Sequence, residues 1–121
     1  MRILGFSKKW QKLSNLEFTT FRFTRRGRDW EVGELVQVVF TPRSKGGGER
    51  LGMAEIIDKQ PRNVAPDWGS PDTAMVSNDE AIADGFMNWG DMFDWLCKTH
   101  DMHRLATEPM NKLTLRKIGD W

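Results

Sequence analysis

A stretch of alternating side chains that ends in a charged turn constrains the fold of this chain more than any other feature. Aromatic and polar residues alternate with period two over 18–24, which is the repeat of a β-strand. The turn 26–29 (Arg-Gly-Arg-Asp) follows, and the signature 30–34 (Trp-Glu-Val-Gly-Glu) then leads into the β-branched, apolar segment 35–41. These segments predict two strands, so the chain is expected to be built around a sheet.

The other segments predict a few more strands and short helices. Strands are expected over 2–6, 50–58 and 112–118, and helices over 8–15, over 77–83 and from Asn88 onward. In the last helix Trp89, Met92, Phe93 and Leu96 share one face, which we expect to pack on the sheet. A flexible hairpin loop is expected over 42–49 and an irregular excursion over 61–71.

This order predicts an α+β fold that is mainly β. Short strands with few helices are typical of a small β-barrel or a curled sheet, here with two or three flanking helices. A length of 121 residues, with 39% hydrophobic and 29% charged residues, fits one globular domain over residues 1–121.

The single cysteine and the absence of a long apolar run bear on the compartment. Cys97 excludes an intrachain disulfide, which suits a reducing environment. No apolar run approaches the length of a membrane span, so we expect a cytoplasmic protein without membrane association. We expect no cofactor.

Positive charge is concentrated in the first half of the chain. Residues 1–50 hold eleven basic and five acidic residues, whereas residues 51–121 hold seven basic and twelve acidic ones. Arg22, Arg25, Arg26 and Arg28 lie within seven positions at the end of the alternating strand. Guanidinium groups bind phosphates and base edges, so the cluster predicts an anion or nucleic-acid site. The alternative is a solvated turn that protects a sheet edge.

The order of four motifs resembles the ASCH domain, a branch of the PUA-like superfamily of small β-barrels. The motifs are Thr-x-Arg at 20–22, Trp-x-Val-Gly-Glu at 30–34, Gly-x-Ala-x-Ile at 52–56, and Asp-Gly-Phe at 84–86 before an amphipathic helix. The resemblance covers most of the chain. It implies a role directed at RNA or nucleotides, with a cleft between the barrel and its first helix.

The family motif, Gly-x-Lys-x-x-Glu-x-Arg, matches residues 15–22 only in part. Arg22 matches outright, and the resemblance implies that Thr20 corresponds to a threonine of the subgroup that hydrolyses N4-acylated cytidines. Asp84 falls where that subgroup carries a glutamate. The lysine of that subgroup is replaced by Glu17, which reverses the charge and cannot act as an ammonium or amine. The departure favours binding over catalysis.

We therefore expect a protein that binds single-stranded RNA or a modified nucleotide through a basic cleft. The expected contacts are Lys12, Thr20, Arg22 and Asp84 in the cleft, with Arg25, Arg26 and Arg28 on backbone phosphates. One alternative is a nucleic-acid-directed hydrolase: an N4-acylcytidine amidohydrolase with Thr20, Asp84 and Lys12 as candidate catalytic residues, or a ribonuclease that uses His100 and His103. Another is a protein-interaction accessory module, with Asp91, Asp94 and Trp95 as the contact surface.

Two further patterns have more than one interpretation. Cys97-x-x-His100-x-x-His103 contains zinc-ligand types, but histidines at a helix end are the simpler interpretation, so we predict no metal site. Trp10, Trp30 and Trp68 are candidate platforms for base stacking. Of these, we expect Trp30 to be a core residue and Trp68 to be the most exposed.

Overall fold

The computed structural model describes residues 1–25, 27–41 and 46–121, so Arg26 and the first half of the predicted loop 42–49 lie outside the described residues. Its elements in chain order are β1 (Arg2–Phe6), the 3-10 helix η1 (Gln11–Ser14), β2 (Glu17–Arg22), β3 (Leu35–Phe40), β4 (Glu49–Arg62), α1 (Asn78–Ala83), α2 (Trp89–Thr99), α3 (Met102–Thr107) and β5 (Met110–Ile118). The expected α+β fold that is mainly β is confirmed.

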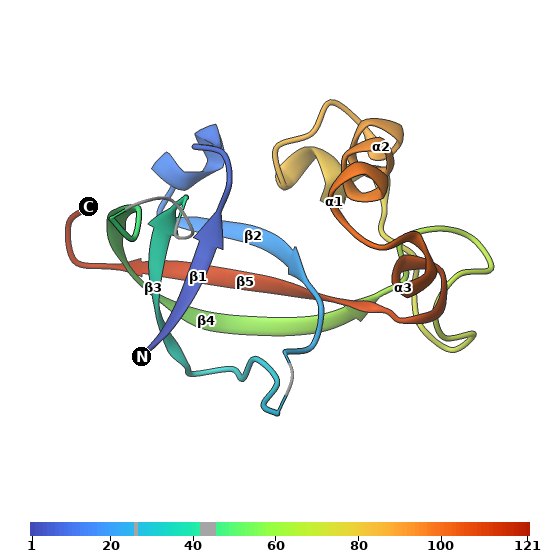
Figure 1. The fold of residues 1–121 in the computed structure, drawn as a ribbon, viewed down its shortest axis with the longest axis horizontal. Helices are drawn as coiled ribbons and strands as arrows, with labels where there is room; N and C mark the ends of the chain where they lie inside the picture. The colour runs from blue at the N-terminus through green and yellow to red at the C-terminus, as the bar shows by residue number, and fades with distance from the viewer. Residues whose placement is uncertain (26, 42–45) are drawn as a thin grey trace.

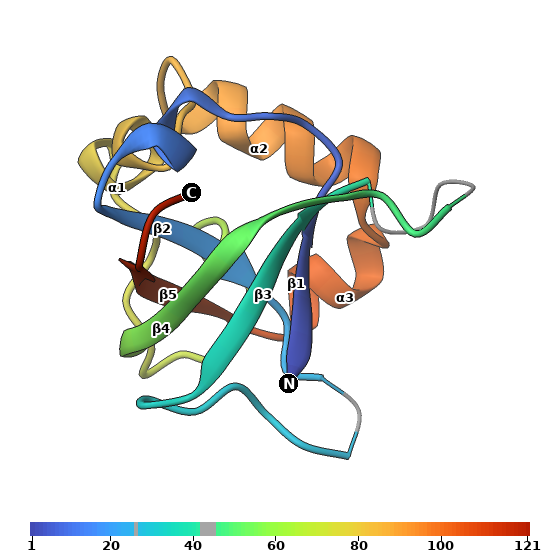
Figure 2. The same cartoon turned by 90° about the vertical axis from the view of Figure 1, so that its left-hand side faces the viewer.

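A five-stranded mixed sheet with the order β1-β3-β4-β5-β2 forms the frame of the molecule. β1 pairs with β3 in parallel, and the other neighbours are antiparallel. The long strands β4 and β5 run through the whole molecule, and α1, α2 and α3 gather around one end of them (Figure 1). β1 and β2 form the two edges, and no ladder joins them within the described residues, so the sheet is curled but not closed (Figure 2).

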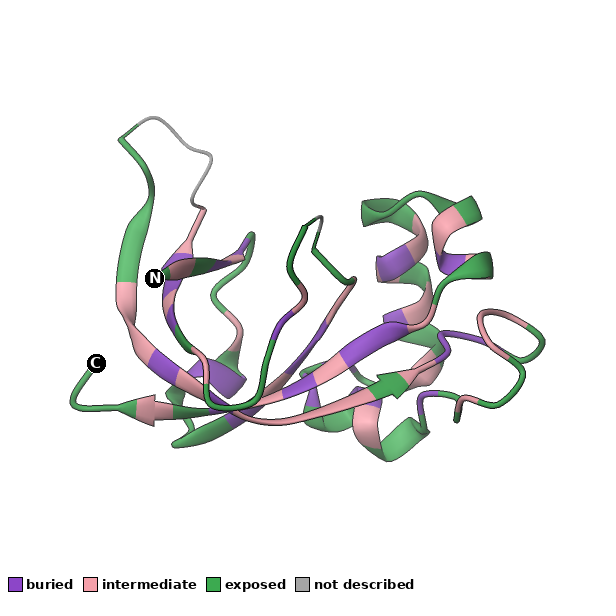
Figure 3. Cartoon of the chain, turned by 90° about the horizontal axis from the view of Figure 1, so that it is seen from below, coloured by how far each residue is buried: buried purple, intermediate pink, exposed green. Residues whose placement is uncertain are grey.

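Two apolar cores lie along this sheet. One is enclosed by the strands and includes Leu4, Val38 and Ile56; the other lies beneath the helices and includes Phe21, Met92 and Leu105. Buried segments alternate with exposed ones along the strands (Figure 3). Trp10 packs against both clusters, so the residues that precede η1 join the strand part of the molecule to the helical part.

The predicted helix starts at Ser77 and Asn88 are confirmed. Ser77 and Glu80 form a capping box at α1, and the Asn88 side chain accepts a hydrogen bond from the Asp91 backbone N–H at α2. Met92 and Leu96 are buried on the face of α2 that was expected to pack inward. In the described part of the chain, no helix combines the length and the apolar character needed to cross a membrane.

Several predicted boundaries were wrong. The expected helix over 8–15 is only the short 3-10 turn η1, because Trp10 remains extended at its start. β4 continues to Arg62 instead of ending at residue 58, since β5 supplies pairing partners as far as Met110. The helix α3 was not predicted; Asp101 caps it by accepting from the His103 backbone N–H.

Candidate nucleic-acid interface

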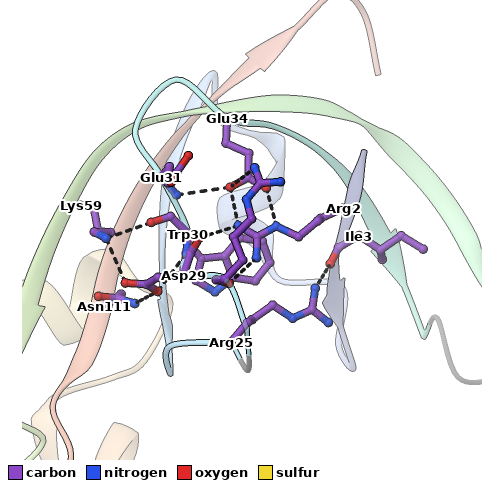
Figure 4. A network of polar contacts seen from close by, with 10 residues as sticks. Arg2, Ile3, Arg25, Asp29, Trp30, Glu31, Glu34, Lys59 and Asn111 are labelled. Carbon is purple, nitrogen blue, oxygen red and sulfur yellow. Dashed lines mark hydrogen bonds and ion pairs between the residues drawn. The ribbon is translucent and has the colours of Figure 1, made fainter.

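The turn that carries the arginines is anchored to the sheet by Asp29. Its carboxylate accepts hydrogen bonds from Lys59 Nζ at 3.0 Å on β4 and from Asn111 Nδ2 at 2.9 Å on β5 (Figure 4). It also accepts from the Trp30 backbone N–H at 2.8 Å. Burial opposes ionisation of Asp29, but the hydrogen bond from Lys59 and the other donors outweigh it and lower its pKa. Asp29 is therefore fixed against both long strands.

The signature 30–34 is a structural support for this turn. Trp30 is buried, as predicted, and the Gly33 backbone N–H donates to the Ile56 carbonyl at 2.7 Å on β4. The Glu34 carboxylate accepts from Arg2 Nε at 2.6 Å, which fixes the start of β1 against the turn. Arg2 and Arg25 both lie over the Trp30 ring, at 4.4 and 5.1 Å from its centroid.

Above this support lies a basic cleft of about 870 Å³, which we call the arginine cleft. Its lining residues come from β1, from the segment after β2 and from α3: Arg2, Phe23, Thr24, Arg25, Arg28, Arg104 and Glu108. Arg2 and Arg104 were not predicted, because their positions are far from the cluster in sequence and only the fold brings them to it.

The cleft arginines differ in how fully their hydrogen bonds are satisfied. Arg2 donates to Glu34 and to the carbonyls of Arg28 and Asp29. Arg104 donates to Glu108 at 2.9 Å and to the Thr24 carbonyl at 3.1 Å. Arg28 lies 3.8 Å from Glu34 with 61% of its side chain exposed, and Arg25 donates to the Ile3 carbonyl at a long 3.5 Å. Arg25 and Arg28 are thus the cleft arginines whose donors are least occupied by the described residues.

Arg22 has a different environment from its neighbours in the sequence. Its Nη2 donates to the Gly5 carbonyl of β1 at 2.7 Å, and its Nε donates to Thr20 Oγ1 at 3.1 Å. The guanidinium lies 4.7 Å from the centroid of the Phe6 ring, and burial lowers its pKa to about 10. Arg22 therefore bridges the two edge strands β1 and β2 by its side chain, and it does not line the arginine cleft.

Lys12 and Asp84 form a buried ion pair behind Arg22. Lys12 Nζ lies 2.8 Å from Asp84 Oδ1, and the two side chains are 5% and 8% exposed. Thr19 Oγ1 lies 3.5 Å from the same carboxylate oxygen. Burial lowers the pKa of Lys12 and raises the pKa of Asp84, in each case against the effect of the partner's charge.

The packing of Trp10 on Gly85 positions this pair. Gly85 has φ +113°, and a Cβ there would lie 2.9 Å from the Trp10 ring. The Trp10 ring also contacts Phe86, with 5.0 Å between centroids. Because Trp10 precedes Lys12 and Gly85 follows Asp84, this contact brings the two charges together. A second cleft of about 450 Å³ opens beside Lys12, between η1 and the end of α1.

The structure thus divides the predicted site residues into two groups. Lys12, Thr20, Arg22 and Asp84 belong to a buried polar network, and Arg25 and Arg28 line the arginine cleft. Arg26 lies outside the described residues. Glu17, at the motif position of the lysine, does not enter the network; it is exposed and pairs with Arg116 at 2.7 Å. The ammonium group in the network comes instead from Lys12, on η1, which pairs with Asp84.

His100 lies closer to the arginines than its sequence position indicated. It ends α2, and its ring packs edge-on against Phe23, which lines the cleft, at 5.6 Å between centroids. His103 belongs to the next helix, α3, so the Cys97-to-His103 spacing does not follow one continuous helix. Within the described residues, no group of three metal-ligating side chains is close enough to hold an ion.

The other two tryptophans pack more than was expected. Trp68 was expected to be exposed, but it is half-buried, with its ring 5.3 Å from that of Phe93. Trp10 is half-buried between Phe86 and Trp95. These rings stabilise the helical part of the molecule.

No protein-family model, curated protein or solved structure matches this chain. The function is therefore argued from the chemistry of the two clefts.

Proposed function

We propose that this protein binds single-stranded RNA or a modified nucleotide, with the phosphates in the arginine cleft. The observation that carries the proposal is the convergence of Arg2, Arg25, Arg28 and Arg104 on one cleft. Arg25 and Arg28 would contact the phosphate directly, because their donors are the least occupied. Arg2 and Arg104 add positive charge while their hydrogen bonds hold the walls of the cleft.

The rigidity of the arginine turn supports this proposal. A turn that only kept a sheet edge solvated would not need Asp29 tied to β4 and β5 or Glu34 tied to β1. Such anchoring restricts the directions in which Arg25 and Arg28 project, which reduces the entropy lost when an anion binds. A cationic cleft on a nearly neutral molecule favours local contacts with a few phosphates over general adhesion to duplexes.

The proposal includes a relationship to the ASCH family and its PUA-like barrel, and a cytoplasmic location. In this interpretation the edge strands β1 and β2, which are not paired within the described residues, take the place of the two strands that close the barrel in the family. Arg22 and Arg25 span the seam between these strands by donating to the carbonyls of Gly5 and Ile3. In this interpretation the buried network at the seam would line the nucleotide cleft that the family resemblance implies.

A binding measurement with short oligonucleotides tests the proposal. Fluorescence anisotropy with a labelled single-stranded RNA should give saturable binding, and the double variant Arg25→Ala/Arg28→Ala should weaken it by roughly tenfold to a hundredfold. Arg50→Ala is the matched control, since Arg50 is exposed on β4 and does not line the cleft. Equal affinity in the double variant and the wild type would exclude the arginine cleft as the binding site.

An N4-acylcytidine amidohydrolase is a second candidate, favoured by the Lys12–Asp84 pair. The missing lysine of the family motif has a counterpart in Lys12, whose ammonium lies beside Asp84, and Thr19 contacts the same carboxylate oxygen. Burial makes loss of the Lys12 proton easier, which suits a group that must act as base or nucleophile. The second cleft gives a route to Lys12 from solvent.

Incubation with N4-acetylcytidine separates catalysis from binding. Release of cytidine and acetate by the wild type, abolished in Thr20→Ala and in Asp84→Asn variants that remain folded, would support the amidohydrolase. If no product forms at high protein concentration, the amidohydrolase is excluded and binding remains the proposed function.

A further inference from the structure

His100 is a titratable group beside the arginine cleft to which the proposed binding mode assigns no role. Phe23 lines the cleft and contacts two side chains at once: His100 packs edge-on at 5.6 Å, and the Arg104 guanidinium lies 4.2 Å from the ring centroid. His100 therefore lies next to the cleft, against the lining residue Phe23 that Arg104 also contacts.

The hydrogen bonds of Thr99 determine which nitrogen of His100 carries the proton. Thr99 Oγ1 donates its one hydrogen to the Trp95 carbonyl at 2.8 Å. The same oxygen lies 2.9 Å from His100 Nδ1, so it can only accept there, and Nδ1 must be the protonated nitrogen. In the neutral ring Nε2 then carries a free lone pair, and it makes no hydrogen bond to the described residues.

The surroundings of His100 keep the imidazole neutral. Partial burial is the main cause that lowers its pKa, and the positive charges of Arg22 on β2 and Arg104 on α3 act in the same direction. At neutral pH His100 thus offers an uncharged hydrogen-bond acceptor beside the cleft arginines, whose guanidinium groups only donate.

We propose that Nε2 of His100 accepts the hydrogen of a ribose 2′-hydroxyl bound in the arginine cleft, so that the cleft selects RNA over DNA. This inference rests on the proposed binding of nucleic acid in that cleft. Arginines bind the phosphates of both polymers equally, whereas the 2′-hydroxyl is the group that separates RNA from DNA. The Glu108 carboxylate in the cleft lining is also an acceptor, but Arg104 holds it at 2.9 Å and its charge repels phosphate.

The test compares three oligonucleotides of the same sequence and length: uridine RNA, the deoxyuridine equivalent and 2′-O-methyl RNA. At pH 8 and fixed salt, wild-type protein should bind the RNA about tenfold more tightly than either of the others, because both lack the 2′-hydroxyl hydrogen. His100→Ala should lower RNA affinity to the DNA level and leave DNA affinity unchanged.

Two further variants keep the test specific. His100→Phe preserves the packing on Phe23 without the acceptor, and it should lose the preference as His100→Ala does. His103→Ala removes an exposed histidine from α3 and should keep the preference. Lowering the pH until His100 is protonated should raise DNA affinity and abolish the RNA preference in the wild type.

Several outcomes would overturn the inference. Equal binding of RNA and DNA by the wild type would remove it while leaving the arginine cleft as a binding site. Retention of the preference in both His100 variants, or its loss in Glu108→Gln alone, would assign the selectivity to another group. Failure of the wild type to bind any of the three would overturn the proposed function together with this inference.

Discussion

At the scale of single residues, burial separates charges that look alike in the sequence. Arg22 and Arg25 are three positions apart, yet Arg22 bridges two strands and Arg25 faces a cleft. Lys12 and Glu17 are both charged residues near η1, but Lys12 is buried with Asp84 and Glu17 is exposed with Arg116. Each charge acts according to the partners that the fold gives it.

Removal of Lys12 should destabilise the protein strongly. Lys12→Met leaves the buried Asp84 without its partner, and we expect the free energy of unfolding to fall by about 3–5 kcal/mol, as is common for broken buried pairs. The double variant Lys12→Met/Asp84→Leu should recover much of the loss. Urea denaturation at pH 7 measures both.

The exposed pair on β2 and β5 is the control for that experiment. Arg116→Ala breaks an ion pair whose side chains are about half exposed, so the loss should stay below about 1 kcal/mol. A Lys12→Met loss as small as that of Arg116→Ala would contradict the view that Lys12 and Asp84 depend on each other.

Gly85 should tolerate no side chain, for two separate reasons. Its positive φ strains any other residue, and a Cβ would press against the Trp10 ring at 2.9 Å. Gly85→Ala is expected to lower stability by about 1–3 kcal/mol. Gly119 has φ +69° without any atom near the Cβ position, so Gly119→Ala should show the backbone effect alone. Equal losses at the two positions, measured by thermal unfolding, would exclude a role for the Trp10 contact.

At the scale of elements, α1 is tied to the sheet through Glu80. Its carboxylate completes the capping box at Ser77 and also accepts from Arg62 on β4 and lies 2.8 Å from Lys112 on β5. Burial opposes ionisation, but these donors and charges outweigh it and lower the pKa of Glu80 to about 2. A helix of six residues is too short to be stable alone. The contacts of Glu80 therefore hold α1 in place on the sheet, and with it Asp84 at the C-terminal end of the helix.

The anchor should give the protein an acid-sensitive stability. Because the pKa of Glu80 is lower in the folded chain than its ordinary value of 4.5, its stabilising effect is complete above about pH 5 and is lost as the pH falls toward 2. Glu80→Gln should be less stable than the wild type at pH 7, by about 2 kcal/mol, and the gap should narrow at pH 3. Urea midpoints at the two pH values test this, and a gap that does not change with pH would contradict it.

At the scale of the whole molecule, the curled sheet converts a nearly neutral chain into one with a localised positive cleft. The formal net charge is only +1, but β1, the turn after β2 and α3 meet at one place and bring their arginines together. The long strands β4 and β5 bring these parts together. The helices lie at one end of the two strands (Figure 1), and Lys59 on β4 and Asn111 on β5 donate hydrogen bonds to Asp29.

The salt dependence of RNA binding should report how many of these arginines contact phosphate. Each phosphate contact removed should reduce the slope of log K against log salt by about 0.7 for a single strand. Arg25→Ala and Arg28→Ala should each produce a reduction of this size, whereas Arg50→Ala should leave the slope unchanged. Slopes that are the same for all three variants and the wild type would show that Arg25 and Arg28 make no phosphate contact.

The strands and helix starts with local causes could be predicted from the amino-acid sequence. The alternation after Glu17, the β-branched run 35–40 and the caps at Ser77 and Asn88 all predicted elements that the structure contains, because period and capping act within a few residues. The burial of Trp30 and the arginine-rich segment were also predicted from the sequence. The limits of η1 and β4 and the existence of α3 were not predicted, because strand pairing and packing partners determine them.

The grouping of charges into shared sites depends on the folded chain and could not be predicted from the sequence. Arg2 and Arg104 join Arg25 and Arg28 across the curled sheet, Lys12 reaches Asp84 across 72 positions, and His100 comes to lie against Phe23. The physical reason is that burial and Coulomb attraction act through space, whereas the patterns readable in a sequence act along the chain.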